Sequence, residues 1–330
     1  MTGTVPTAPG ATTDQTTSAP EIGLSHLSKF YGEVLGVNRV NLTIPPGITS
    51  LVGPNGSGKS TLMNLIAGLL QPTAGAVHVH QVTIDDPERF YPLIGYCTQF
   101  DTFPKGITGF NLVNSLLALH GWSKSETHDR SWAVLEKVGL VDAAHRKVAG
   151  YSKGMRQRVK LATAIGHDPR VLILDEPLNG LDPMARAEFI RLFQDRAAEG
   201  NHVVVSSHIL HEVDLISDQV IMMSHGYVVA EGQIQGVRSE IQEQPSTILV
   251  RCDKPALVAQ RLFSHDHVVE ARISDEDKGI LVRTRNTELF YSILNRIVIE
   301  EDLVIEGVIP TDDDVNSVYN YLIGTNGQSS

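Results

Sequence analysis

The stretch from Gly53 to Thr61 reads GPNGSGKST and matches the pattern G-x-x-x-x-G-K-[ST]. A short apolar segment, Ile48–Val52, precedes it, and the helical pattern of Lys59–Leu69 follows it. In this context the pattern is typical of a phosphate-binding loop, because its glycines let backbone N–H groups turn inward around phosphate oxygens. The start of the following helix adds the positive end of its dipole. The stretch therefore predicts an α/β fold that binds a nucleotide.

Two positions of this loop carry expected chemistry beyond the backbone. Lys59 is expected to place its charge on the β- and γ-phosphates, and the Ser60 hydroxyl is expected to coordinate Mg²⁺. The alternative is a glycine turn that happens to precede a helix, and the flanking strand and helix disfavour it. The predicted nucleotide-binding residues of the loop are Gly53, Pro54, Asn55, Gly56, Ser57, Gly58, Lys59, Ser60 and Thr61.

A second stretch, Val171–Glu176, reads VLILDE. Its apolar run predicts a strand that is covered on both faces. At the end of this strand, Asp175 is expected to face the metal and Glu176 to polarise the water that attacks the γ-phosphate. Such a run is more often a core strand with solvated carboxylates, but its place after a phosphate loop favours the catalytic interpretation.

The composition is that of an ordinary globular protein, with 42% hydrophobic and 20% charged residues in a chain of 330. The longest apolar runs are far shorter than the ~20 residues that span a bilayer, so we expect membrane association only through a partner. Residues 1–20 contain no Lys or Arg and no apolar run, which predicts a disordered tail and no secretory signal. The cysteines, Cys97 and Cys252, are far apart and fit a reducing cytoplasm.

The charge distribution bears on possible partners. The net charge is −11, and much of it lies within residues 241–330. Phosphate contacts require clustered Lys and Arg, so this acidic end disfavours a nucleic-acid groove.

The N-terminal part of the chain alternates strand and helix patterns. Residues 22–44 predict short strands, and residues 107–149 carry the helical spacing of an insertion. The other predicted strands are Val77–Ile84, Ile94–Thr98, His202–Ser206, Gln219–Ser224 and Tyr227–Glu231, and Ala187–Ala198 is a predicted helix.

From Thr247 onward the chain predicts a second, small α+β domain. The predicted strands are Thr247–Cys252, Val268–Ser274, Gly279–Arg285 and Leu303–Ile309, and the predicted helices are Pro255–Phe263, Thr287–Arg296 and Val315–Ile323. An acidic turn, Asp275–Lys278, joins the second and third strands. The order β-α-β-β-α-β fits a ferredoxin-like or ACT-like domain.

A third stretch, Tyr151–Arg158, reads YSKGMRQR and lies between the phosphate loop and VLILDE. It resembles the signature motif of ABC-type ATPases, whose usual form is LSGGQ. Together the three stretches make residues 22–235 similar to the nucleotide-binding subunit of an ABC transporter. The resemblance implies a P-loop ABC-type ATPase core over residues 21–240, with an antiparallel β subdomain and a helical subdomain at about 100–160. Residues 241–330 would then form an accessory or regulatory domain.

The resemblance also implies site residues that no pattern singles out by itself. Tyr31, within KFYG, matches the aromatic residue that stacks on adenine, and Gln99 matches the Q-loop glutamine, which reaches Mg²⁺ and the attacking water. Asp182 fits the D-loop, which meets the opposite subunit, and His208 fits the switch histidine, which contacts the γ-phosphate. The implied catalytic residues are Glu176, His208, Lys59 and Gln99, and the implied metal ligands are Ser60, Gln99 and Asp175.

Within the signature segment, the resemblance gives Ser152 and Gly154 contact with ATP that is bound to another subunit. A serine and glycine that only cap a helix are the alternative. The segment departs from the usual motif at Tyr151, Lys153 and Met155. Variants of the YSKGM type are similar to those of drug- and antibiotic-resistance exporters, which implies export.

The implied function is MgATP binding and hydrolysis in a homodimer, or in a dimer with a paired ABC subunit, that drives export through an integral membrane permease. The subunit would lie on the cytoplasmic face of the cell membrane, with no nucleic-acid partner. Phe100–Pro104 and the helical insertion are candidates for the surface that receives the permease. Phe103 is expected either to be exposed there or to belong to the core, and Cys97 is expected to pack in its strand.

Three alternatives stay open. An importer ATPase with an ACT-like regulatory domain has a similar organisation. A soluble ABC ATPase that acts on ribosomes or DNA is less favoured, because the sequence has neither a second ATPase unit nor a long coiled-coil insertion. A non-enzymatic scaffold gated by nucleotide is disfavoured by the complete set of catalytic residues.

Overall fold

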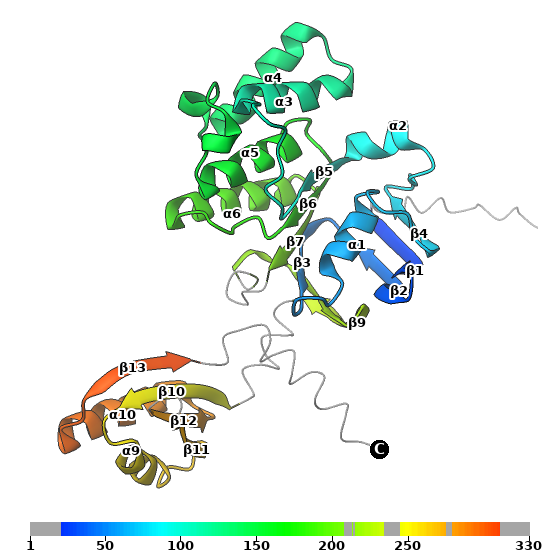
Figure 1. Ribbon diagram of the computed structural model, residues 1–330. Coiled ribbons are helices and arrows are strands. Elements are labelled where there is room, and N and C mark those ends of the chain that lie inside the picture. The colour runs from blue at the N-terminus through cyan, green and yellow to red at the C-terminus, as the bar shows by residue number, and fades with distance from the viewer. Residues whose placement is uncertain (1–20, 208–212, 214, 234–244, 275–278, 311–330) are drawn as a thin grey trace, which may run out of the picture.

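The computed structural model describes residues 21–207, 213, 215–233, 245–274 and 279–310 (Figure 1). The predicted tail 1–20, His208, the turn Asp275–Lys278 and the predicted helix Val315–Ile323 lie outside this range. Among the helices that the structure describes, none combines the length and the apolar character needed to cross a membrane.

A six-stranded sheet forms the centre of the described part of residues 47–233, in the order β5-β6-β7-β3-β8-β9. Neighbouring strands are parallel except β8 and β9, which form an antiparallel hairpin. The strands are β3 (Gly47–Val52), β5 (Ile94–Cys97), β6 (Val171–Asp175), β7 (His202–Ser207), β8 (Gln219–Ser224) and β9 (Tyr227–Gln233). Because β3, β5, β6 and β7 run in the same direction, the loops that follow them meet at one edge of the sheet.

A second sheet, with the order β2-β1-β4, is antiparallel. Its strands are β1 (Ile22–Tyr31), β2 (Val34–Ile44) and β4 (Ala74–Val79). Helix α1 (Lys59–Ile66) shares one buried cluster with both sheets, which includes Leu24, Leu62 and Ile173. This packing fixes the start of α1, and therefore the end of the phosphate loop, against the two sheets.

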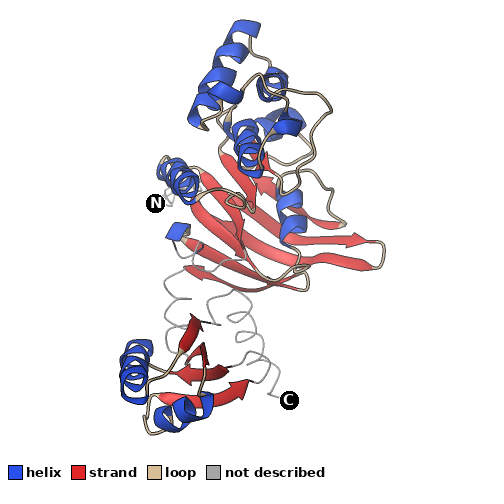
Figure 2. Ribbon diagram, turned by 60° about the vertical axis from the view of Figure 1, so that its left-hand side comes forward, coloured by secondary structure: helices blue, strands red, loops and turns tan. Residues whose placement is uncertain are grey.

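Helices α3 and α4 pack against α5, and α5 packs against β5 at the edge of the central sheet (Figures 1 and 2). The predicted insertion, residues 107–149, contains α3 and α4 but not α5. The three helices span Gly109–Leu117, Lys124–Lys137 and Lys153–Ile165. Each begins at a hydroxyl cap, since Thr108, Ser123 and Ser152 accept a hydrogen bond from an N–H group of the first turn. Their buried residues, such as Leu135 and Leu161, form one cluster with the central sheet.

Three helices differ from their predicted ends by more than one residue. Helix α10 (Thr287–Glu301) continues past the predicted Arg296, and the other two differ for local reasons. Helix α1 ends before the predicted Leu69, because Gly68 adopts a φ of +71° and ends the helix in a left-handed turn. Helix α6 (Pro183–Ala198) begins before the predicted Ala187, because Asp182 caps its first turn.

The region after the second sheet also differs from the prediction. Strand β4 ends at Val79 and not at Ile84, because His80 and Gln81 adopt positive φ angles and turn the chain. The short helix α2 (Pro87–Phe90), which starts at an Asp-Pro pair, was not predicted.

The C-terminal residues form a separate four-stranded sheet with the order β11-β12-β10-β13, antiparallel throughout. Its elements are β10 (Ser246–Cys252), α9 (Pro255–Leu262), β11 (Val268–Ser274), β12 (Gly279–Thr284), α10 (Thr287–Glu301) and β13 (Ile305–Pro310). The two helices and the sheet share a buried cluster that includes Val258, Ile280 and Phe290. This part of the chain therefore has a core of its own.

The buried His202 predicts that stability depends on pH. Burial lowers the pKa of His202 to about 4, and His80, whose ring lies 5.2 Å away, lowers it as well. In the unfolded chain the pKa of this histidine is near 6.5. As pH falls, His202 is therefore protonated in the unfolded chain before it is protonated in the folded protein. We expect this residue alone to reduce the free energy of unfolding by about 2 kcal/mol between about pH 7 and about pH 5.

Urea unfolding at the two pH values measures this effect. The substitution His202→Phe is expected to remove that part of the pH dependence, whereas His78→Phe, at an exposed position of β4, is expected to keep it. Equal pH dependence in the two variants would contradict the assignment.

Candidate active site

The phosphate loop joins β3 to α1 and lines a cavity of about 190 Å³, together with Gln99, Asp175 and Glu176. The loop needs glycine at Gly58, because φ there is +105° and a Cβ atom would lie 2.6 Å from the backbone oxygen of Gly36. The backbone geometry that the sequence pattern predicts is therefore present.

Lys59 points into this loop. Its Nζ atom donates to the backbone oxygens of Gly53 and Pro54, at 2.6 and 3.0 Å. Burial lowers the pKa of Lys59, and the negative charges of Glu176 and Asp175 oppose that shift. The lysine thus contacts two loop carbonyls, is affected by the charge of two carboxylates, and lines the same cavity as they do.

Asp175 ends β6 and is buried, and each of its carboxylate oxygens accepts a different hydroxyl. The Ser60 Oγ atom donates to Oδ2 at 2.8 Å, and the Ser206 Oγ atom donates to Oδ1 at 2.6 Å. The structure therefore brings the predicted metal ligands Ser60 and Asp175 into direct contact.

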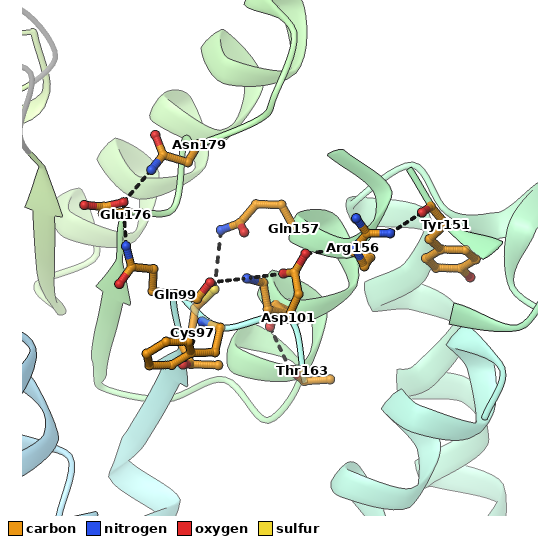
Figure 3. Close-up of polar contacts among 12 residues, drawn as sticks. Cys97, Gln99, Asp101, Tyr151, Arg156, Gln157, Thr163, Glu176 and Asn179 are labelled. Carbon is orange, nitrogen blue, oxygen red and sulfur yellow. Dashed lines mark hydrogen bonds and ion pairs between the residues drawn. The ribbon is translucent and has the colours of Figure 1, made fainter. Parts of the chain in front are cut away.

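Glu176 adopts a φ of +49°, in the left-handed region, and its N–H group donates to Ser206 Oγ at 2.8 Å. Two side-chain amides donate to its Oε2 atom: Gln99 at 3.0 Å and Asn179 at 2.5 Å (Figure 3). The predicted catalytic residues Gln99 and Glu176 are thus in contact, although they come from different loops.

Tyr31 lies at the end of β1, beside the phosphate loop. Its side chain is 47% exposed, and its hydroxyl lies 3.5 Å from Thr61 Oγ1. The Lys29 ammonium lies 5.6 Å from the ring centroid. The ring is thus about half exposed in this place, and its stacking on adenine stays a prediction.

The signature residues lie apart from this cavity. Ser152 caps α5 and accepts from the Met155 N–H group at 3.2 Å, and Asp182 caps α6 and accepts from the Ala185 N–H group at 2.9 Å. That backbone hydrogen bond lowers the pKa of Asp182. Ser152, Gly154 and Asp182 are not among the residues that line the cavity. The predicted switch residue His208, one position beyond β7, lies outside the described residues.

The loop after β5 has an exposed and a partly buried aromatic residue. Phe100 is 71% exposed, whereas Phe103 is partly buried and packs against the helical core. For Phe103 the core interpretation therefore holds. Cys97 is buried, as predicted, and Gln157 donates to its sulfur at 3.7 Å.

An ion-pair cluster ties this loop to α5, and it was not predicted. Asp101 pairs with Arg156 Nε at 2.8 Å (Figure 3) and with Lys160 Nζ at 2.9 Å. Lys160 Nζ also donates to the backbone oxygen of Gln99 at 3.3 Å. These hydrogen bonds and charges outweigh desolvation and lower the pKa of Asp101. The opposite charges of Asp101, Arg156 and Lys160 were visible in the sequence, but only the fold brings them together.

The fold and the site define a P-loop ATPase with an ABC-type signature segment. A family model described as "ABC transporter" matches residues 37–179. The bacitracin transport ATP-binding protein BcrA of Enterococcus faecalis is 30% identical over 310 residues, which cover 93% of this chain and 97% of that protein. The daunorubicin/doxorubicin resistance ATP-binding protein DrrA of Streptomyces peucetius is 30% identical, covering 78% of this chain and 82% of that protein.

Solved structures agree with these sequence relatives. The ATP-binding cassette MJ0796 in a dimeric, post-hydrolysis state bound to ADP and Pi is 27% identical, with a TM-score of 0.60 over 64% of this chain and 98% of that chain. An ATP-binding subunit of an ABC transporter is 26% identical, with a TM-score of 0.62 over 67% and 93%. The chain therefore belongs to the family of ABC transporter ATP-binding subunits, whose members hydrolyse ATP.

The phosphate loop gives a direct test of the site. Gly58→Ala forces a Cβ atom to within 2.6 Å of the backbone oxygen of Gly36, so we expect this steric clash to distort the loop and to lower ATP affinity by about 10–100-fold. Gly56→Ala is the matched control, because Gly56 also has a positive φ but nothing lies within 4 Å of its Cβ position. Calorimetric titration with ATP compares the two, and equal affinities would refute the steric explanation.

Proposed function

We propose that this chain hydrolyses MgATP in a dimer and thereby drives export through a separate membrane permease. The observation that carries the proposal is that the phosphate loop, Gln99, Asp175 and Glu176 line one cavity together. Bacitracin transport and drug resistance appear in the names of relatives that match most of the chain. Together with the YSKGM variant, these names support export over import.

The phosphate loop and Lys59 would bind the ATP phosphates. The N–H groups at the start of α1 supply partial positive charge, and Lys59 adds a full charge close to both carboxylates. For the phosphates to bind, Lys59 has to exchange its bonds to the carbonyls of Gly53 and Pro54 for bonds to phosphate oxygens. Tyr31 would stack on the base.

The donor set fits Mg²⁺. A hydroxyl and a carboxylate are the hard oxygen donors that this ion prefers, and Ser60 Oγ and Asp175 Oδ2 lie 2.8 Å apart. Ser60 and Asp175, with Gln99 from the same cavity, would hold the ion. When bound, Mg²⁺ neutralises charge on the phosphates.

Glu176 would orient and polarise the attacking water. Its carboxylate lies beside Gln99, so that both polar groups face the same cavity. Because Gln99 belongs to the loop that follows β5, its contact with the bound nucleotide and Mg²⁺ would change the position of that loop. His208 would complete the contacts to the γ-phosphate.

A dimer accounts for the residues that lie outside the cavity. Ser152 and Gly154 begin α5, whose first-turn N–H groups suit an anion. Since they do not line the cavity of their own chain, they would contact the ATP of a second copy or of a paired ABC subunit, next to Asp182. Closure of the dimer is favoured only while the γ-phosphate provides these contacts.

The permease would bind near the loop after β5 and the helical subdomain. Phe100 is exposed in this loop, and an apolar side chain in such a place suits a helix from the partner. This contact would hold the subunit on the cytoplasmic face of the cell membrane. No nucleic-acid partner is proposed.

We further propose the domain limits 1–20 for a tail, 21–240 for the ATP-binding domain with its helical subdomain at about 100–160, and 241–330 for an accessory domain. The order β10-α9-β11-β12-α10-β13 and the sheet order β11-β12-β10-β13 support a ferredoxin-like or ACT-like fold for the accessory domain. Its separate core supports a role in dimer stability or regulation, not in ATP binding.

The substitution Glu176→Gln tests catalysis. It keeps the shape of the side chain but removes the carboxylate that polarises water, so we expect steady-state ATP hydrolysis to fall by at least about 100-fold. The variant is expected to accumulate as an ATP-bound dimer in size-exclusion chromatography with MgATP. Hydrolysis at the parent rate would exclude Glu176 as the catalytic carboxylate.

Deletion of residues 241–330 tests the role of the accessory domain. The separate core of this part predicts that the truncated chain still binds ATP with an affinity within about threefold of the parent. Dimerisation or its regulation is expected to weaken, as measured by analytical ultracentrifugation with MgATP. A folded truncation that no longer binds ATP would contradict this role.

A further inference from the structure

One buried hydroxyl contacts both acidic residues of the site. Ser206 lies on β7, directly opposite Asp175 of β6 in the register of the sheet, and its side chain has no exposed surface. Its Oγ atom donates to Asp175 Oδ1 at 2.6 Å and accepts from the Glu176 N–H group at 2.8 Å. A hydroxyl can do both at once, since it carries one donor and two acceptor positions.

The first bond sets the orientation of the Asp175 carboxylate. Oδ1 is bound by Ser206, so Oδ2 is the oxygen that meets Ser60. Hydrogen bonds from hydroxyls to a carboxylate are short and strong, and this one lies in a buried place where water does not compete. Without the Ser206 hydroxyl, Asp175 loses the contact that prevents its rotation away from Ser60.

The second bond holds the backbone of Glu176. Its φ of +49° is uncommon for a residue with a Cβ atom, and such a conformation persists only where the surroundings fix it. The Ser206 Oγ atom binds the N–H group of that residue, while Gln99 and Asn179 bind the carboxylate at the other end. Ser206 thus fixes the point from which the Glu176 side chain reaches the cavity.

We propose that Ser206 is a positioning residue for ATP hydrolysis, which sets the metal-facing oxygen of Asp175 and the direction of the Glu176 side chain through one hydroxyl. The inference rests on the proposed function, in which Asp175 holds Mg²⁺ and Glu176 polarises the attacking water. It assigns to β7 a direct effect on the chemistry at the end of β6.

The substitution Ser206→Ala in the full chain removes both bonds. We expect kcat to fall by about 10–100-fold, the size of effect that a small misplacement of catalytic groups produces. The Mg²⁺ concentration for half-maximal activity is expected to rise at least about fivefold, because Asp175 no longer presents a fixed oxygen. The Kd for ATP in excess EDTA is expected to stay within about threefold, because the phosphate loop is unchanged.

Two further variants separate positioning from packing. Ser206→Cys fills the place of the hydroxyl with a slightly larger thiol that offers only weak hydrogen bonds. It is expected to lose kcat as the alanine variant does, and it provides the test if the alanine variant does not fold. Ser50→Ala removes another fully buried serine, on the adjacent strand β3, whose hydroxyl contacts Ser217 and, among the residues that the structure describes, no carboxylate. Its kcat and Mg²⁺ dependence are expected to match those of the parent at a temperature where it is folded.

The outcomes distinguish this inference from the proposed function. If Glu176→Gln is inactive but Ser206→Cys and Ser206→Ala retain the parent kcat and Mg²⁺ dependence, the positioning role is overturned and the ATPase assignment survives. An equal loss in Ser50→Ala would also overturn it, because packing alone then explains the effect. If Glu176→Gln retains activity, the proposed function is wrong, and the positioning role of Ser206, which depends on it, is wrong as well.

Discussion

The parallel pairing of β3, β5, β6 and β7 is the constraint on which the rest of the site depends. Parallel strands end at the same edge of a sheet, so the phosphate loop, Gln99 and the Asp175-Glu176 pair meet there although they are far apart along the chain. The register between β6 and β7 adds Ser206 at the level of Asp175. A shift of this register by one residue would replace that hydroxyl with an apolar or misdirected side chain.

Much of the cavity could be predicted because its signals are local. The glycines of the phosphate loop and the run VLILDE each indicate a backbone conformation within a few residues. The structure brings Gly58, Lys59, Asp175 and Glu176 together around one cavity. The same holds for the helical insertion, whose caps and periodic leucines are adjacent in sequence. Local signals also account for two of the differences at helix ends, since Gly68 and Asp182 are residue types that end and begin helices.

Other contacts could not be predicted because they depend on tertiary distance. A serine in an apolar strand, such as Ser206, looks like any other polar residue until the register places it beside a carboxylate. Asn179 contacts Glu176, which has a positive φ although it is not a glycine. No sequence pattern predicts this backbone conformation. Asp101 and Lys160 become partners only when α5 lies across the loop that follows β5.

That last ion-pair cluster has a consequence for how two subunits share their work. Asp101 binds Arg156 and Lys160, so the loop that contains Gln99 is linked directly to the helix that Ser152 caps. In the proposed dimer, Gln99 senses the ATP of its own chain and Ser152 touches the ATP of the other. In such a dimer, each subunit would transmit the occupancy of its own site to its neighbour through this ion-pair cluster, and a substitution that breaks the cluster in one chain would impair the opposite site.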